Sequence, residues 1–211
     1  MLTKEQLNIL SVFKMDILFG LTFRQIKQQS RQKSNNQVQI ALSRFKKENL
    51  IKVEKVGNVS VFSLDLNNTT LAYLNILNEH EIKKSALPTN ALEDLKKQIF
   101  KHTEFFILMV FGSYVKHKQT PKSDVDIAII VESEQAKKEI IPYVETAKRR
   151  EILPLDCHIF DKTEFLEMLS ADFENLGKQI IKSHLIYYGF ITYCNLIWMN
   201  QIYISKRQRM S

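Results

Sequence analysis

The chain has 211 residues, of which 45% are hydrophobic and 25% are charged, with only five Gly and four Pro. These values match average soluble globular proteins and exclude a disordered, collagen-like or low-complexity chain. The length suits one or two domains. The net charge of +7 is uneven, because residues 1–65 hold eleven Lys and Arg against five Asp and Glu, a net +6. This concentration is typical of a module that binds a polyanion, although a solvated basic face without a partner has the same composition.

The first 65 residues predict three short helices followed by a hairpin. The expected elements are helices over residues 3–13, 22–29 and 34–48 and strands over residues 50–56 and 59–64. Thr3 is a typical helix cap, and the third helix has an inward stripe of Val38, Ala41, Leu42 and Phe45. Gly57-Asn58 predicts the hairpin turn, because such a turn requires positive φ.

This order of elements resembles the winged helix-turn-helix family over roughly residues 1–65. In that family the third helix enters the DNA major groove by its N-terminal part. The resemblance implies base contacts from Asn35, Asn36, Gln37 and Gln39 and phosphate contacts from Arg44, Lys52 and Lys55. A protein–protein adaptor is the alternative, since winged helices also serve in that role.

Residues 66–89 are expected to form a linker helix, with Leu71, Leu74 and Leu77 as a candidate dimerisation stripe. Pro88 breaks the chain, and Asn90 with Glu93 three residues later predicts a capping box that opens the next helix. The second domain is therefore expected over residues 90–211.

Residues 105–131 carry the sharpest chemical signal. A run of seven apolar residues, 105–111, ends at Gly112-Ser113, and a second apolar run, 127–131, follows Asp124-Val125-Asp126. The first run predicts a strand buried on both faces, and Ser113 is expected to cap a short helix that favours an anion. Two carboxylates two residues apart on a strand lie on the same face and repel each other, so they favour a hard divalent metal.

The stretch from Gly112-Ser113 to Asp124-Val125-Asp126 resembles the active-site signature of the minimal nucleotidyltransferases, a branch of the DNA polymerase beta superfamily. The resemblance covers about residues 90–200 and implies a third carboxylate on a later strand. Asp156 is the candidate, since it stands alone in the apolar run 152–160 and is expected to be buried; an edge-strand residue facing water is the alternative. His158 shares its side of that strand and is either near the site or simply packed.

The resemblance further implies catalysis by two Mg²⁺ ions, or Mn²⁺, held by Asp124, Asp126 and Asp156. The nucleoside triphosphate, expected to be ATP, would be bound by Gly112, Ser113, Lys116, Lys122 and Ser123. The family commonly has an arginine after the GS pair, whereas Tyr114 and Lys116 occupy that region here. No His pair has the spacing of a zinc site.

The chain as a whole is thus expected to be α/β (α+β): an N-terminal winged helix-turn-helix domain followed by a small mixed-sheet nucleotidyltransferase domain. The expected reaction transfers AMP from ATP to a hydroxyl on a protein or nucleic acid, with double-stranded DNA as a partner and an antitoxin-like role beside a toxin. The alternative is a DNA-binding regulator whose nucleotidyltransferase fold is a non-catalytic nucleotide sensor or a partner-binding module.

Residues 185–204 are twenty residues without a charge, which is long enough to cross a bilayer. Polar residues within the run argue against a membrane span and favour a buried or oligomer-forming element. Cys157 and Cys194 form no CxxC pair, so a reducing, cytoplasmic location is expected.

Overall fold

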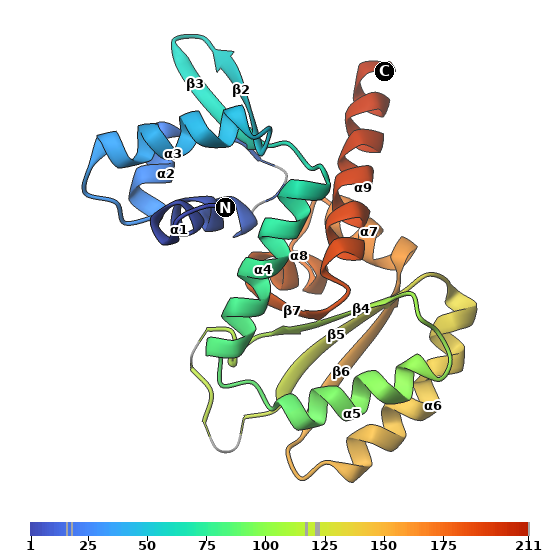
Figure 1. The fold of residues 1–211 in the computed structure, drawn as a ribbon. Coiled ribbons are helices and arrows are strands. Elements are labelled where there is room, and N and C mark those ends of the chain that lie inside the picture. Colours follow the sequence, from blue (N-terminus) through green and yellow to red (C-terminus); the bar gives the residue numbers. More distant parts are fainter. Residues whose placement is uncertain (16, 18, 117, 121–122, 211) are drawn as a thin grey trace. The chain divides into compact units, whose positions relative to one another are not determined.

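The computed structural model describes residues 1–15, 17, 19–116, 118–120 and 123–210 (Figure 1). The chain divides into two compact units. The first comprises Met1–Leu77 with Gln201–Ser211, and the second comprises Asn78–Asn200.

The first unit begins with three short helices whose starts are fixed by hydroxyl caps. They are α1 (Lys4–Ser11), which continues into a 3₁₀ turn, η1 (Val12–Met15), then α2 (Phe23–Gln29) and α3 (Asn35–Lys47). Thr3, Thr22 and Ser34 each accept a backbone N–H from the first turn of the helix that follows. The predicted helices are confirmed, and the four residues expected on the inner face of α3 are all buried.

A three-stranded antiparallel sheet completes this part of the unit. The strands β2 (Ile51–Val56) and β3 (Val59–Leu64) form the predicted hairpin, and Gly57 has a φ of +61° at its turn. A two-residue strand, β1 (Leu21–Thr22), pairs with β3 and gives the order β1-β3-β2. The short β1 has no apolar run, which is why the sequence does not reveal it.

The helix α4 (Asn68–Lys84) follows the hairpin. Leu71, Leu74 and Leu77 are at most 9% exposed in the single chain. The structure describes a single chain, and the dimerisation stripe stays a prediction.

The second unit contains a four-stranded mixed sheet in the order β6-β5-β4-β7. Its strands are β4 (Phe106–Phe111), β5 (Val125–Val131), β6 (Leu155–Asp161) and β7 (His184–Tyr188). β4 runs antiparallel to β5 and β7, whereas β5 and β6 are parallel. All six residues of β4 are buried, as the apolar run predicts for a strand with neighbours on both edges and both faces. The mixed sheet agrees with the expected fold of this domain.

Two helices cover one face of this sheet, α5 (Thr89–Phe100) and α6 (Glu134–Arg150) (Figure 1). Leu92, Leu95 and Ile99 of α5 pack with Ile140 and Val144 of α6 and with alternate residues of β4 and β5 in one apolar cluster. This cluster holds the sheet against the two helices, and so it positions the ends of the strands.

The predicted capping box at Asn90 and Glu93 is wrong. α5 begins at Thr89 after Pro88, without a side-chain cap, so Asn90 lies inside the helix. The Glu93 carboxylate instead accepts hydrogen bonds from Lys96 Nζ (2.6 Å) and from Tyr187 Oη (2.8 Å) of β7.

The uncharged C-terminal run forms two elements instead of one. The helices α7 (Lys162–Ser170) and α8 (Leu176–Lys182) precede this run. The start of the run belongs to β7, and the rest belongs to α9 (Phe190–Met210). Gly189 separates β7 from α9 with a φ of +80°, and a Cβ there would lie 2.5 Å from the carbonyl oxygen of Phe106. Among the described residues, no helix combines the length and apolar content needed to span a membrane.

Candidate active site

Two acidic residues lie side by side where the parallel strands β5 and β6 begin. Asp126 is the second residue of β5 and Asp156 the second residue of β6, and the two are register partners. Register partners in a sheet have side chains on the same face, so these two carboxylates are neighbours. Asp124 directly precedes β5 and is exposed, whereas Asp126 is half-buried.

Gly112 lies directly after β4, against the carboxylate of Asp126. Its φ is +70°, and a Cβ added to it would lie 1.9 Å from Asp126 Oδ2. Only glycine meets both conditions, because other residues rarely adopt this φ and any Cβ would displace the carboxylate. The Gly-Ser pair and the second Asp of the sequence motif therefore form one structural unit.

Residues 112–116 form a turn, so the prediction of a short helix capped by Ser113 is wrong. The N–H of Lys116 donates to Gly112 O (3.2 Å) and the N–H of Lys118 donates to Ser113 O (3.0 Å), and none of the described residues 112–116 and 118–120 is helical. Tyr114 is buried in the apolar cluster beneath the sheet, whereas Lys116 is exposed. Among the described residues of this segment, Lys116 and Lys118 are both exposed cations within reach of a ligand.

The expected ligands just before β5 are only partly described. Ser123 is half-buried and its hydroxyl oxygen accepts the backbone N–H of Thr120 (2.8 Å). Lys122 lies outside the described residues.

Asp156 was expected to be buried, and this is wrong. Its side chain is 52% exposed, because β6 is an edge strand of the sheet. His158 Nε2 lies 3.2 Å from Asp156 Oδ2, and the His158 ring also contacts Phe111, with ring centroids 5.9 Å apart. His158 therefore belongs to the site, which the sequence left undecided.

A divalent metal fits the chemistry of these residues in part. Carboxylate oxygens are the preferred ligands of Mg²⁺ and Mn²⁺, and Gly112 leaves room for the Asp126 carboxylate. Within the described part of the chain, however, no three His, Cys, Asp or Glu side chains form a group that could hold a metal ion. The structure brings Asp126 and Asp156 together, and the three-carboxylate site stays a prediction.

Residues 93–188 match the family model described as Polymerase beta, Nucleotidyltransferase. This part of the chain is a nucleotidyltransferase domain. It contains the whole sheet and every residue of the carboxylate site, and it spans less than half of the chain.

A comparison with solved structures finds similarity to a chain described as "Crystal structure of the toxin-antitoxin with AMP-PNP". The identity is 18%, and the match covers 59% of this chain and 95% of that one. A TM-score of 0.35 is too low to carry an argument about fold or partners. No curated protein matches the chain significantly.

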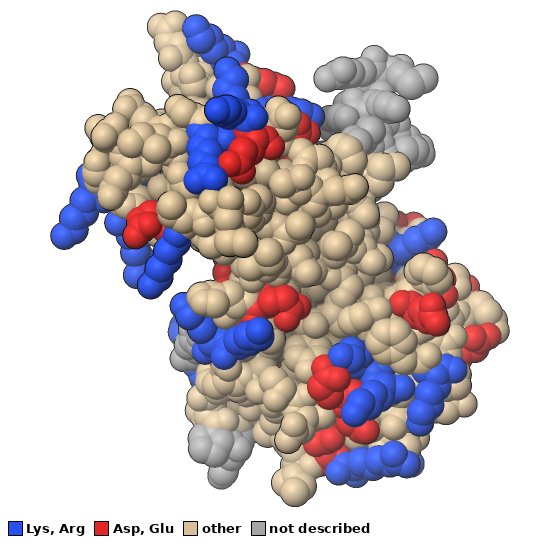
Figure 2. Space-filling model, in the orientation of Figure 1, with Lys and Arg blue, Asp and Glu red and all other residues tan. Residues whose placement is uncertain are grey.

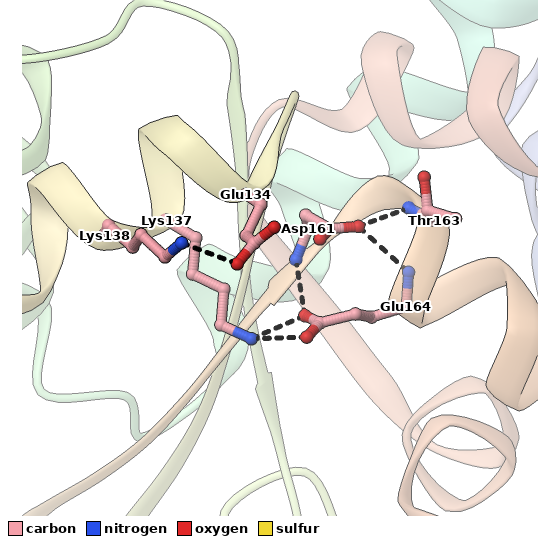
Figure 3. A network of polar contacts seen from close by, with 6 residues as sticks. All are labelled: Glu134, Lys137, Lys138, Asp161, Thr163 and Glu164. Atoms are coloured by element: carbon pink, nitrogen blue, oxygen red, sulfur yellow. Dashed lines mark hydrogen bonds and ion pairs between the residues drawn. The ribbon is translucent and has the colours of Figure 1, made fainter.

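The acidic residues at the other end of β6 in the nucleotidyltransferase domain are already saturated with partners (Figure 3). The Asp161 carboxylate accepts the N–H groups of Thr163 (2.7 Å) and Glu164 (2.9 Å) and so caps α7. Glu164 accepts Asp161 N–H and forms an ion pair with Lys137 at 2.6 Å. In the same network Lys138 donates to Glu134 and lowers the pKa of that carboxyl. Through the cap and the ion pair, Asp161 and Glu164 hold α6, β6 and α7 together, so these two acids have structural roles.

Cys157 lies between Asp156 and His158 in sequence but on the opposite face of β6. It packs against the apolar cluster, and burial raises the pKa of its thiol to about 12. The thiol is therefore protonated at neutral pH, as expected for a cysteine that packs in a core.

Some of the residues expected to contact DNA are exposed in the first unit, whereas others are engaged in contacts within it. Asn35, Asn36, Gln37 and Gln39 are exposed on α3. Arg44 instead donates to Glu48 (2.7 Å), Gln6 (2.8 Å) and Met1 O (2.7 Å), so its guanidinium is committed within the unit. Lys52 forms an ion pair with Asp65 at 3.0 Å, whereas Lys55 is exposed.

Proposed function

We propose that the chain is a metal-dependent nucleotidyltransferase that moves AMP from ATP to a hydroxyl on a protein or nucleic acid. The observation that supports this most is the pairing of Asp126 with Asp156 beside Gly112, within a region that matches the nucleotidyltransferase family. Structural carboxylates are normally paired with cations or backbone donors, as Asp161 and Glu164 are. Two acids placed next to each other, here the half-buried Asp126 and the 52% exposed Asp156, fit a role in binding instead.

Asp124, Asp126 and Asp156 are the residues proposed to hold two Mg²⁺ ions, or Mn²⁺. Bound there, the metal supplies Lewis-acid activation of the phosphate and of the acceptor hydroxyl. The backbone at Gly112 and the hydroxyl of Ser113 are proposed to bind the β- and γ-phosphates, with Lys116 as the supporting cation and Lys122 and Ser123 as further contacts.

In the proposed reaction the acceptor oxygen forms a bond to the α-phosphorus of ATP. The bond from that phosphorus to the bridging oxygen breaks, pyrophosphate leaves, and the proton of the acceptor hydroxyl passes to water. The role of the chain is to hold the phosphates and the acceptor in line, because little other covalent chemistry is required in phosphoryl transfer.

The test is transfer of label from α-³²P-ATP, with Mg²⁺, to components of a cell extract. Asp126→Ala should abolish labelling, whereas Asp172→Ala, which removes an exposed acid between α7 and α8, should not. Absence of labelling by the unaltered chain, together with tight DNA binding, would instead support a regulator that carries out no chemistry. Co-purification from cells would identify a protein acceptor or toxin partner.

We further propose that the first unit binds double-stranded DNA through α3 and the hairpin. The unit carries most of the net charge, and Figure 2 shows Lys and Arg side chains projecting from its surface. A hollow of about 850 Å³ lies between α2, α3 and the hairpin, lined in part by Arg24, Gln39 and Lys46. Polar side chains at the start of α3 suit base edges, and cations around a hollow suit phosphates.

Substitutions in α3 and the hairpin separate base reading from phosphate attraction. Gln37→Ala with Gln39→Ala should relax sequence preference. Lys55→Ala should weaken binding to all sequences and reduce the salt dependence, because it removes one phosphate contact. Lys52→Ala is the matched control: alternation along β2 puts Lys52 on the other side of the strand, where it pairs with Asp65. Equal losses from Lys52→Ala and Lys55→Ala would contradict this assignment.

A further inference from the structure

The outer edge of the sheet carries a row of three side chains that begins at the carboxylate site. Asp156, His158 and Phe160 alternate along β6, so all three lie on one face of the strand. His158 and Phe160 are half-buried, with ring planes 8° from parallel and centroids 6.4 Å apart. An acid is thus followed along this edge by two nearly parallel aromatic rings.

The His158 ring is held in place from two sides. Its Nε2 lies 3.2 Å from Asp156 Oδ2, and its ring packs against Phe111 of β4, which is only 8% exposed. Phe160 packs in turn against Phe165 of α7, with centroids 6.1 Å apart. Rings fixed in this way lose little conformational freedom when a ligand binds.

A hollow of about 450 Å³ adjoins this row at Phe160. Met168 and Phe173 contribute to its apolar lining, and Phe173 is 69% exposed. The volume lies within the usual range for small-molecule sites, roughly 300–1,000 Å³. The edge of β6 therefore leads from exposed acids to an open apolar hollow.

Three of the four polar side chains that line this hollow are hydrogen-bonded, and the fourth, Glu167, is exposed. Lys137 pairs with Glu164, and Asn175 donates to Met168 O (2.7 Å) and accepts from Lys178 N–H (3.1 Å). The hollow therefore offers a ligand mainly aromatic and apolar surface, together with the exposed carboxylate of Glu167.

The spacing along β6 matches the dimensions of a nucleotide. At about 3.3 Å per residue, His158 lies roughly 7 Å and Phe160 roughly 13 Å beyond Asp156. A sugar separates the base of a nucleotide from its α-phosphate by a length of that order. A nucleotide whose phosphates lie at Gly112 and Asp126 can therefore extend its base along this edge.

We propose that His158 and Phe160 form the stacking site for the purine base of the nucleoside triphosphate. The proposal rests on the proposed function, since it takes the carboxylate end of β6 as the phosphate end. Stacking acts on the face of the base and is largely independent of its edge. ATP and GTP should therefore depend on the two rings to a similar degree.

The test compares calorimetric binding of ATP and of inorganic triphosphate, each with Mg²⁺, to the full-length chain. Phe160→Ala should raise the Kd for ATP roughly 5- to 100-fold, the range expected from the loss of one stacking contact. The Kd for inorganic triphosphate should be unchanged, because that ligand has no base. Phe105→Ala, which removes a 70% exposed ring next to β4, should change neither value.

His158 is tested by both removal and replacement of its ring. His158→Ala should weaken ATP binding, and His158→Phe should restore it, because the second change keeps a ring but loses the contact with Asp156. Thermal unfolding midpoints within a few degrees of the unaltered chain would show that each variant is folded.

The outcomes separate this proposal from the one on which it rests. If the unaltered chain binds ATP and triphosphate equally, or if Phe160→Ala leaves the Kd for ATP unchanged, the stacking site is wrong and the nucleotidyltransferase proposal stands. If neither ligand binds and no label is transferred, both proposals fall. Loss of binding of both ligands in Phe160→Ala would also overturn the stacking site, since it would indicate a role in phosphate binding or folding.

Discussion

The two faces of the four-stranded sheet are built from alternate residues of the same strands, yet they differ sharply in chemistry. Val125, Ile127 and Ile129 of β5 are fully buried beneath α5 and α6. Between them on the other face lies Asp126, next to its register partner Asp156. Because side chains alternate along a strand, one short segment contributes both to the core and to the candidate site.

The second face is open only in part. Ala128 and Ile130 share the side of Asp126 but are at most 2% exposed, so the accessible region is confined to the strand starts and to the edge strand β6. Stability and chemistry therefore depend on different residues of the same strands in this domain. Substitutions on the two faces should therefore affect different measurements.

The largest expected effect is the loss of transfer activity in Asp126→Asn. Metal ligation is worth several kcal/mol in such reactions, so the rate should fall about 10³-fold or more. The free energy of unfolding without metal should stay within about 0.5 kcal/mol or rise, because a repulsion between carboxylates is removed. Initial rates and urea denaturation measure the two quantities. Full activity in this variant would refute the role of Asp126.

Ile129→Ala should have the opposite profile. The side chain is fully buried, and its truncation is expected to lower the free energy of unfolding by about 2–5 kcal/mol. Activity per folded molecule should be nearly unchanged, because the residue lies on the covered face. Ile152→Ala is the matched control, since Ile152 is completely exposed and should change stability by less than about 0.5 kcal/mol. A specific loss of activity in Ile129→Ala would break the separation of the two faces.

Gly112→Ala should lower both the transfer activity and the free energy of unfolding. A positive φ costs a residue with a Cβ roughly 1–2 kcal/mol, and the added atom would also displace the Asp126 carboxylate, so activity is expected to fall about 100-fold.

Gly57→Ala separates these two causes. Gly57 has a similar φ of +61°, but a Cβ there meets nothing within 4 Å. The Gly57→Ala variant should lose the same roughly 1–2 kcal/mol of stability because of its positive φ, but it should retain transfer activity. Equal activity of the two alanine variants would show that the contact between Gly112 and Asp126 is unimportant.

Much of this arrangement could be predicted from local sequence. The apolar runs before Gly112 and after Asp126 predicted β4 and β5, and hydroxyl residues predicted the starts of α1, α2 and α3. These signals are local: periodicity, caps and turn residues act within a few positions of themselves.

Features that depend on tertiary structure could not be predicted in the same way. Asp156 was expected to be buried because its neighbours in sequence are apolar, but its exposure follows from the position of β6 at the edge of the sheet, which periodicity does not report. The uncharged run after residue 184 likewise gave no sign that it divides at Gly189 into a strand and a helix. Phe160 became a candidate only when the structure showed its ring in a row with His158 and Asp156, and the same view decided between the two interpretations of His158.

The stability change in Glu93→Gln is expected to be the smallest of these, and it tests whether polar contacts also stabilise the covered face. Glu93 of α5 accepts hydrogen bonds from Lys96 and from Tyr187 of β7, and these lower the pKa of its carboxyl, the Lys96 contact most. Glu93→Gln should cost less than about 1 kcal/mol at pH 7, because the pair is partly exposed. Since the pKa is lowered in the folded chain, this stabilisation is present above the ordinary Glu pKa and is lost as the pH falls through the lowered value.

Urea denaturation of the unaltered chain and of Glu93→Gln at pH 7, 5 and 3 measures this difference. The two stability curves should be furthest apart at neutral pH and converge in acid, where both side chains are uncharged. Tyr187→Phe, which removes one donor and keeps the ring, should give a smaller difference with the same pH trend. A gap that persists at pH 3 would mean that Glu93 contributes by packing. The covered face would then be held by apolar contacts alone, which would make the contrast between the two faces complete.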